Sequence, residues 1–322
     1  MDISVVICAF SERRWRDLGA AIGSVRRQTR PAREIIVVID PHGQLVARAR
    51  SAWPDVLVVP NKHTRGLASA RNTGVSLARG DVVAFLDDDA QAHERWLERL
   101  AAAYEDSRIL AAGGAVEPVW PAGRPRWFPA EFDWVVGCSH SGMPRETTPV
   151  RNLVGANMSF HRQPLVELGG FREGMGGLET GPIGCEETEL CIRARQRWPD
   201  RLTLYVPDAH VRHTVSSERT RLPYFLSRCH AEGRSKAVVA SLVGRMDGLE
   251  TERSYVRRTL AAGIVRGLRG ALRRRTGFCR PLAILLGLAA TTAGYASGRL
   301  RGAGGYARRL RERTSIAALG DG

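Results

Sequence analysis

Apolar runs of four to six residues alternate with stretches of helical pattern through the first half of the chain. The apolar runs predict strands over residues 3–7, 34–39, 56–59 and 82–86. The stretches between them predict helices over residues 15–28, 47–52 and 69–78. Strands that alternate with helices form βαβ units, whose helices cover both faces of a parallel sheet. The pattern therefore predicts an α/β fold with a mostly parallel central sheet and flanking helices.

The second half of the chain is less regular and becomes helical and increasingly basic beyond residue 223. A Pro- and Trp-rich stretch at 118–134 and a Gly-rich loop at 169–184 separate the later predicted elements. Those elements are an apolar run at 150–160, a helix at 186–198 and a strand at 202–206. We therefore expect two parts, a catalytic α/β domain over residues 1–222 and a basic helical extension over residues 223–322.

Acidic residues stand directly after two of the predicted strands. Asp40 follows the second strand, and Asp87, Asp88 and Asp89 follow the fourth. In parallel α/β sheets, ligands bind outside the carboxyl ends of the strands. Three adjacent carboxylates repel one another, and a divalent cation such as Mg²⁺ or Mn²⁺ compensates because it prefers hard oxygen ligands. A solvated acidic loop is the alternative, but the position after a strand favours a metal site.

A segment rich in small residues, from Gly66 to Gly74, contains Arg71 and Asn72. Small residues let the backbone approach a ligand or a neighbouring strand closely, and an Arg can pair with a carboxylate or a phosphate. The same pattern also suits a helix that packs on the sheet. The residues alone leave both interpretations open.

Two adjacent glutamates, Glu186 and Glu187, enter a predicted helix directly after the Gly-rich loop. The helix dipole favours carboxylates in a first turn, which gives them a structural interpretation. Glu189 is also spaced for an ordinary ion pair with Arg193, four residues further on. A carboxylate with a raised pKa near an acceptor hydroxyl would instead serve as a general base. Either Glu186 or Glu187 fits this role on sequence grounds.

His210 and His213 come shortly after the predicted strand at 202–206. A late histidine can complete a metal site made of carboxylates, because imidazole is a common metal ligand. On spacing alone, a surface histidine with no ligand role is the more common outcome.

The basic residues concentrate toward the end of the chain. The net charge is +15, and residues 250–322 contribute +11 of it through fifteen Arg and four acidic residues. The stretch 255–275 places seven of these arginines among Val, Leu and Ile. This amphipathic pattern suits anionic lipid headgroups, and no nucleic-acid-binding motif accompanies it. We therefore expect an anionic membrane surface as a partner, and no nucleic acid, with a solvated helix face as the alternative.

Residues 281–298 contain no charged side chain, and arginines stand at both ends. Their number, eighteen, is near the lower limit for a membrane-spanning helix. More than half of the segment is Ala, Gly, Thr and Ser, and its flanking arginines give no positive-inside orientation. We expect a helix that lies on the membrane or packs on the α/β domain, and a membrane span stays open.

The six cysteines are scattered and show no Cys-x-x-Cys spacing. This pattern favours free thiols in a reducing compartment over a disulfide framework. The first apolar run begins at once after Met1 and Asp2, without the basic segment of a signal peptide. Together with the basic extension, these features predict a cytoplasmic protein, peripheral at the inner face of the cell membrane.

The motifs match one family in order as well as in type, and the chain resembles the family 2 glycosyltransferases, inverting enzymes with the Rossmann-like GT-A fold. The motifs are Ser4-Val-Val-Ile-Cys-Ala-Phe10, Ile36-Val-Val-Ile-Asp40, Gly66-x4-Arg71-Asn72-x-Gly74, Phe85-Leu-Asp87-Asp88-Asp89 and Gly155-Ala-Asn157-Met-Ser-Phe-x-Arg162. Glu186-Glu187-x-Glu189-Leu and a following His213 complete the set, which covers roughly residues 1 to 215. The pattern is most similar to actinobacterial and archaeal members that glycosylate lipid-linked acceptors.

The resemblance implies where a nucleotide-sugar donor binds. Ala9, Phe10 and Asp40 would line the nucleoside pocket, with Asp40 reading the edge of the base. Asp87 and Asp89 are the outer residues of the family's Asp-x-Asp motif, and with His213 they would hold Mg²⁺ or Mn²⁺. The remaining donor-binding positions would be Arg71, Asn72, Asp88 and Asn157, the last near the diphosphate and the acceptor.

The resemblance also implies single displacement, in which a base takes the acceptor proton as the acceptor oxygen attacks the anomeric carbon. Glu187 stands where the family has an Asp, so it is the candidate base, and its longer side chain leaves Glu186 as the alternative. The implied activity moves a hexosyl group from a nucleoside-diphosphate sugar to a lipid-linked or glycan hydroxyl. A nucleotidyltransferase on a related sheet and a catalytically inactive nucleotide-sugar-binding protein are the alternatives.

Overall fold

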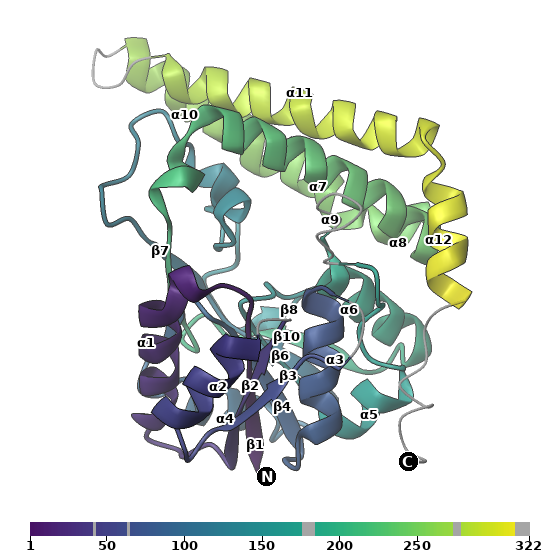
Figure 1. Ribbon diagram of the computed structural model, residues 1–322. Helices are drawn as coiled ribbons and strands as arrows, with labels where there is room; N and C mark the ends of the chain where they lie inside the picture. Colours follow the sequence, from purple (N-terminus) through teal and green to yellow (C-terminus); the bar gives the residue numbers. More distant parts are fainter. Residues whose placement is uncertain (41–42, 63–64, 176–183, 273–277, 313–322) are drawn as a thin grey trace.

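The computed structural model describes residues 1–40, 43–62, 65–175, 184–272 and 278–312 (Figure 1). A sheet with flanking helices occupies the lower part of the view, and a layer of long helices lies across the top. All strands of the described residues lie between Ile3 and Thr214, and the helical layer begins at Leu222. The chain therefore divides into a sheet and a helical layer, close to the boundary predicted at residue 222, which stays a prediction.

The main sheet has eight strands among the described residues, in the order β3-β2-β1-β4-β9-β6-β10-β8. The first four are parallel: β1 (Ile3–Ala9), β2 (Glu34–Ile39), β3 (Leu57–Pro60) and β4 (Val82–Asp87). β9 (Asn157–His161) runs antiparallel between β4 and β6 (Ile109–Gly113). β10 (Leu202–Tyr205) and the short β8 (Thr148–Pro149) extend the sheet. The predicted α/β fold is confirmed, and two of these strands, β9 and β8, run antiparallel to the others.

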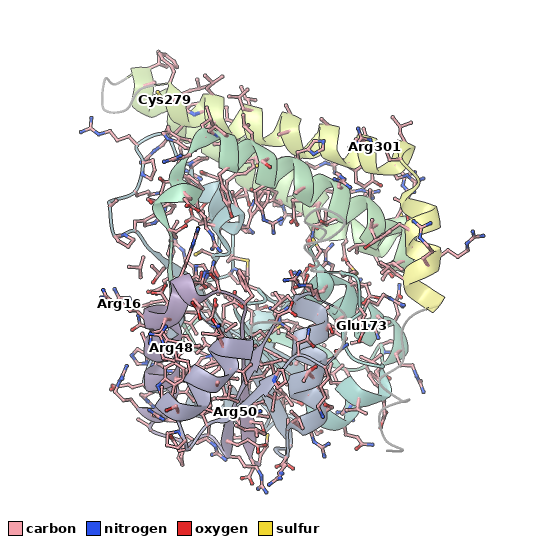
Figure 2. All side chains as sticks on the ribbon, viewed as in Figure 1. Arg16, Arg48, Arg50, Glu173, Cys279 and Arg301 are labelled. Carbon is pink, nitrogen blue, oxygen red and sulfur yellow. The ribbon has the colours of Figure 1, made fainter. Side chains whose placement is uncertain are left out.

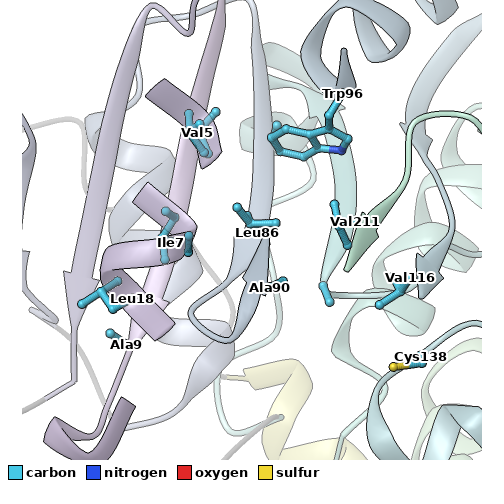
Figure 3. Close-up of a cluster of buried hydrophobic side chains, with 14 of the residues drawn as sticks. Val5, Ile7, Ala9, Leu18, Leu86, Ala90, Trp96, Val116, Cys138 and Val211 are labelled. Carbon is cyan, nitrogen blue, oxygen red and sulfur yellow. The ribbon is translucent and has the colours of Figure 1, made fainter. Parts of the chain in front are cut away.

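Helices pack on both faces of the sheet because alternate residues of each strand point to opposite faces. Val5 and Ile7 of β1 belong to one core cluster with Leu18 and Trp96 (Figure 3). Val6, between them, belongs to a second cluster with residues of α3 and α6. The flanking helices are α1 (Trp15–Arg26), α2 (Gly43–Ala52), α3 (Leu67–Leu77), α4 (Trp96–Ala103), α5 (Arg162–Glu167) and α6 (Glu186–Arg197).

A second, three-stranded sheet has the order β5-β11-β7. Its strands are β5 (Ala90–Ala92), β7 (Val116–Val119) and β11 (Val211–Thr214). β11 pairs antiparallel with β5, so that His213 lies opposite Ala90. Because β5 begins directly after Asp89, this pairing brings His213 to the acidic end of β4. The hydrophobic pattern did not predict this sheet, since each strand has only three or four residues.

The helical layer is built on α7 (Leu222–Val243) and α11 (Cys279–Leu300), which pack along each other. Their contact is close: a Cβ on Gly233 would stand 2.0 Å from the carbonyl oxygen of Thr291. Cys279 and Arg301 mark the two ends of α11 in Figure 2. The other parts are α8 (Arg245–Gly248), α9 (Glu250–Ser254), a π-helical turn (Tyr255–Leu260), α10 (Ala261–Leu272) and α12 (Ala303–Glu312).

The uncharged segment 281–298 forms most of α11. By length and composition, α11 is a helix of the described residues that could cross a membrane, although part of it is buried inside the protein. In the predicted basic stretch, residues 273–275 lie outside the described residues, as do residues 176–183 of the Gly-rich loop.

Candidate active site

The acidic end of β4 and one histidine form a cluster of potential metal ligands. Ligand atoms of Asp87, Asp89 and His213 lie within 4.8 Å of one another. Asp87 is partly exposed, whereas Asp89 and His213 are buried. Nε2 of His213 lies 2.9 Å from Oδ1 of Asp89. The structure thus brings together the three residues expected to hold the metal, two from the end of β4 and His213 from β11.

Two arginines from outside the predicted motifs neutralise this cluster. Nη1 of Arg14 lies 2.6 Å from Oδ1 of Asp88 and 3.1 Å from Oδ2 of Asp89. Nη2 of Arg219 lies 3.7 Å from the same oxygen of Asp89. Burial raises the pKa of Asp88 to about 7, against the opposing charge of Arg14. Burial also acts to raise the pKa of Asp89, but the hydrogen bond and charge of His213, with both arginines, lower it to about 2.

The cluster fits a divalent cation. Two carboxylate oxygens and an imidazole nitrogen are donors that Mn²⁺ accepts, and Mg²⁺ takes the oxygens. Oδ2 of Asp88 and Nδ1 of His213 are buried at this place without a hydrogen-bond partner among the described residues. Buried polar atoms are normally paired, so these two atoms mark a site that a further group would complete.

Arg71 joins the acidic end of β4 to the first turn of α6. Its Nη1 lies 2.8 Å from Oε1 of Glu186, and its Nη2 lies 3.7 Å from Oδ1 of Asp87. Nη2 also donates to the carbonyl oxygen of Gly155 at 3.1 Å. Arg71 and Glu186 are both buried. Glu186 is therefore committed to an ion pair, whereas Glu187 is partly exposed and has no ion pair among the described residues.

The surroundings of Glu187 suit a group that accepts a proton. Burial and the charge of Glu186 raise its pKa to about 7, and Arg71 opposes this shift. Cys185, just before the pair, has a φ of 68°, which is rare for a residue with a Cβ. Its Sγ lies 3.0 Å from Oε1 of Glu232 on α7. This contact helps to fix where α6 begins, and therefore where Glu187 points.

The expected nucleoside end lies at the ends of the adjacent strands β1 and β2. Asp40 is buried there, and its Oδ2 accepts a hydrogen bond from the backbone N–H of Gly66 at 2.8 Å. Phe10 is 43% exposed, and the guanidinium of Arg14 stacks on its ring at 5.0 Å. Ala9 is buried at the end of β1. A nucleotide base could stack on the exposed ring of Phe10 and form hydrogen bonds with the carboxylate of Asp40.

Asn72 and Asn157 are buried, and their side chains are fully engaged within the protein. The amide of Asn72 makes two hydrogen bonds to the backbone of Phe171, at 2.8 and 2.9 Å. Oδ1 of Asn157 accepts from Nε1 of Trp96 at 2.8 Å, and its Nδ2 donates to two backbone carbonyls. These contacts hold loops together, so any effect of the two residues on a donor would pass through the backbone.

A cavity of about 1240 Å³ lies between the carboxyl edge of the main sheet and the helical layer. Four of the predicted site residues line it, namely Arg71, Asp87, Glu186 and Glu187. The other predicted residues, Asp89 and His213 among them, are not part of its lining. The cavity therefore connects the metal cluster, through Asp87, with the carboxylate of Glu187, which has no ion pair among the described residues.

The sequence predicted Arg71 but not two other cations of the site, Arg14 and Arg219. Arg14 lies four residues after Phe10, and Arg219 lies six residues after His213. The signal that could have found them is charge, because three adjacent aspartates at a buried strand end need cations to offset their repulsion. No comparable feature of the sequence indicated that α7 lines the cavity.

Comparison with known proteins adds independent findings. The family model described as glycosyl transferase family 2 matches residues 4–169. A glucosyl-dolichyl phosphate glucuronosyltransferase from Haloferax volcanii is 34% identical over 243 residues, which are 74% of this chain and 77% of that protein.

Two solved structures resemble this one. The mannosyltransferase PcManGT from Pyrobaculum calidifontis, in complex with GDP-Man and Mn²⁺, has a TM-score of 0.54 at 17% identity, covering 90% of this chain and 86% of that one. GalNAc-T7 with UDP, GalNAc and Mn²⁺ has a TM-score of 0.53 at 18% identity, covering 75% of this chain and 51% of that one. Both likenesses agree with the fold predicted from the sequence.

Proposed function

Because this chain belongs to the family 2 glycosyltransferases and has the GT-A fold, we propose that it is an inverting, metal-dependent transferase. It would move a hexosyl group from a nucleoside-diphosphate sugar to a hydroxyl of a lipid-linked or glycan acceptor by single displacement. The observation that carries this proposal is the cavity shared by Asp87, at the metal cluster, and Glu187, a carboxylate without an ion pair in the part of the chain that the structure describes. One part of the cavity suits a diphosphate, and another suits the acceptor hydroxyl.

Asp87, Asp89 and His213 would hold the divalent cation, Mg²⁺ or Mn²⁺. A cation bound there would supply positive charge to the leaving diphosphate. Asp89 would offer an ionised carboxylate to the cation near neutral pH, because its pKa is about 2. Both solved structures above contain Mn²⁺, which supports the use of a divalent cation.

Glu187 is the general base of this proposal. It lines the cavity, and a pKa of about 7 lets it take a proton from an acceptor hydroxyl near neutral pH. Glu186 is the weaker candidate because its carboxylate is held by Arg71 at 2.8 Å. Arg71 lies between Glu186 and Asp87, so it sets the spacing between the base and the metal cluster.

The nucleoside of the donor would bind at the ends of β1 and β2. The exposed ring of Phe10 offers a stacking surface, and Asp40 would read the edge of the base beside Ala9. Arg71 would stand near the diphosphate, because it already lies beside Asp87. Asn72, Asp88 and Asn157 would act indirectly, by holding the loops and the arginine around the donor.

A lipid-linked acceptor is supported by the relative from Haloferax volcanii, whose name gives glucosyl-dolichyl phosphate as its acceptor. That relative is 34% identical over 243 residues, which are 74% of this chain. We therefore favour a sugar carried on a lipid phosphate over a free glycan.

The helical layer offers a surface for an anionic membrane. The outward side of α11 exposes Leu282, Leu285 and Leu286, and no charged residue lies between Arg280 and Arg299. Two more large apolar side chains are exposed beside it, Leu272 of α10 at 78% and Phe278 at 61%. The exposed leucines of α11, with Leu272 and Phe278, are called the α11 face below. Arginines at its rim match anionic headgroups.

We propose that α11 lies on the membrane, with the α11 face in the headgroup region. Its other side packs closely on α7 through Gly233 and Gly294, so lipid cannot surround it. All six cysteines are free, which agrees with a reducing cytoplasm and a position at the inner face of the membrane.

The test is to incubate the purified protein with nucleotide sugars, Mn²⁺ and a glucosyl lipid phosphate, and to identify both products. We expect metal-dependent release of a nucleoside diphosphate and a glycolipid whose new anomeric centre is inverted, as seen by NMR. Release of pyrophosphate would instead support a nucleotidyltransferase. Glu187→Gln should lower transfer by roughly a hundredfold or more, while the matched control Glu105→Gln, at an exposed position outside the cavity lining, should retain it.

A further inference from the structure

The cavity changes from charged to apolar along its lining. At the sheet edge it is lined by Asp87, Glu186 and Glu187. The wall formed by the 3-10 helix Ala130–Val136 and the helical layer carries large, mostly apolar side chains, namely Phe132, Trp134, Tyr255, Leu260 and Leu288. Leu288 is on α11, the helix that carries the α11 face. A ligand that fills this cavity would therefore be polar at one end and apolar at the other.

Arg228 of α7 lies where the charged and the apolar parts of the lining meet. An added Cβ on Gly184 would stand 3.6 Å from its Nη2, so the guanidinium reaches the chain three residues before Glu187. Its Nη1 is buried and has no hydrogen-bond partner among the described residues. The nearest carboxylate oxygen that pairs with it belongs to Glu232, at 3.8 Å, which is beyond hydrogen-bond distance.

Two other cations of the cavity wall are already engaged. Arg151 donates to both carboxylate oxygens of Glu252, at 2.7 and 2.8 Å. Nζ of Lys236 lies 2.9 Å from Glu252 and 3.5 Å from Glu232. Glu232 is therefore shared between Lys236 and Arg228, and it compensates the charge of Arg228 only in part. A guanidinium with an unused donor in a cavity is a receptor for an oxyanion.

We infer that Arg228 binds the phosphate of the lipid-linked sugar acceptor. This inference rests on the proposed function and names the group that the enzyme would recognise on its acceptor. With the acceptor hydroxyl at Glu187, the sugar ring would span the start of α6 and place its phosphate at Arg228. The lipid would then follow the apolar wall past Leu288 toward α11 and the membrane.

A carboxylate on the donor sugar is the other oxyanion that this guanidinium could meet. The position of Arg228 favours the acceptor, because it lies on α7, in the same helical layer as the apolar wall. The proposed donor residues Phe10 and Asp40 directly follow β1 and β2, at the carboxyl edge of the sheet. The phosphate and the carboxylate can be told apart by changing the acceptor and the donor separately.

Two acceptors that differ only in the phosphate test the subsite. One is citronellyl phosphate esterified to glucose, and the other is citronellyl glucoside without the phosphate. We expect the wild-type enzyme to prefer the first by roughly tenfold to a hundredfold in kcat/KM, as a charge-assisted hydrogen bond would give. Arg228→Gln should remove this preference, mainly through a higher KM, and Arg228→Lys should restore part of it.

Arg234→Gln is the matched control, because Arg234 is on the same helix but is not part of the cavity lining. It should keep the full preference for the phosphate. An equal preference in the wild-type enzyme and in Arg228→Gln would overturn the inference. So would a change in the choice between UDP-glucuronate and UDP-glucose with an unchanged acceptor preference, since Arg228 would then serve the donor.

A binding measurement separates this inference from the proposed function. Calorimetry with citronellyl phosphate should show binding to the wild-type protein that Arg228→Gln weakens by the same roughly tenfold to hundredfold factor. Transfer to neither acceptor, with this binding intact, would contradict the proposed function and leave the subsite supported. Equal binding by both proteins would overturn the subsite, whatever the transfer assay shows.

Discussion

The carboxyl edge of the sheet and the helical layer line the same cavity, but their charged groups are held differently. At the sheet edge, Arg71 lies 2.8 Å from Glu186, and Nε2 of His213 lies 2.9 Å from Asp89. In the helical layer, Lys236 and Glu252 are paired at 2.9 Å, but Arg228 stands 3.8 Å from its carboxylate, beside large apolar side chains. Closely paired groups fix the positions of reacting atoms, whereas a weakly paired cation and apolar walls leave room for a ligand. We therefore assign chemistry to the sheet edge and acceptor recognition to the helical layer.

The largest effect should come from the metal cluster. Asp89→Asn should lower transfer by about a thousandfold or more, because the cation would lose one of its two carboxylate ligands. The loss of a Mn²⁺-dependent rise in melting temperature provides a second measurement. Asp55→Asn, at a carboxylate that is 61% exposed, is the matched control and should behave like the wild type. A fully active Asp89→Asn enzyme would contradict the role of the sheet edge.

The next effect is on stability and concerns only the helical layer. Gly233→Ala should lower the free energy of unfolding by about 1–3 kcal/mol, because its Cβ would collide with the backbone of α11. Chemical denaturation measures this loss. Gly304→Ala is the control, since nothing lies within 4 Å of a Cβ there and Ala favours a helix. Equal stability of the two variants would show that α7 and α11 do not pack closely in solution.

A smaller effect should appear in membrane binding. Replacing Leu282, Leu285 and Leu286 together by Gln should weaken co-sedimentation with anionic liposomes by roughly tenfold or more, because apolar contact area is lost. Added salt should weaken binding of the wild-type protein as well, through its arginines. Leu57→Gln, at an exposed leucine of β3, is the control. If the wild-type protein does not bind liposomes, the α11 face is not a membrane-binding surface.

The smallest effect is a shift in pH dependence. With Glu187 as the base and a pKa of about 7, kcat/KM should fall as the pH drops below about 7, because the carboxylate becomes protonated. Glu186→Gln removes the like charge that helps to raise this pKa. The acidic limb should therefore move to lower pH in a pH–rate profile, even if the rate at high pH is reduced. An unmoved limb would mean that another group titrates.

Much of the fold could be predicted because its parallel half follows simple periodicity. The strand predicted at 34–39 is the observed β2, and the run at 82–86 misses only Asp87 of β4. The apolar run at 150–160 yielded only β9, which is antiparallel. The three-stranded sheet could not be predicted, since strands this short owe their existence to pairing partners far along the chain.

The candidate site, too, could be predicted only in part from the sequence. Acidic motifs at strand ends pointed to Asp87 and Asp89, and the structure joins His213 to them. The spacing of residues in the sequence could not identify Arg14 and Arg228. The role of each depends on a tertiary contact with another element. The sequence also left Glu186 and Glu187 equivalent, and only the ion pair between Glu186 and Arg71 distinguishes them.

The comparison between the two regions is tested most directly by steady-state kinetics with one variant from each. Acceptor KM and kcat are measured for Glu187→Gln and Arg228→Gln under the same donor and metal conditions. We expect Glu187→Gln to lower kcat by roughly a hundredfold or more, the effect of losing a general base, and Arg228→Gln mainly to raise the acceptor KM. The same pattern in both variants would contradict the division of chemistry and acceptor recognition between the sheet edge and the helical layer.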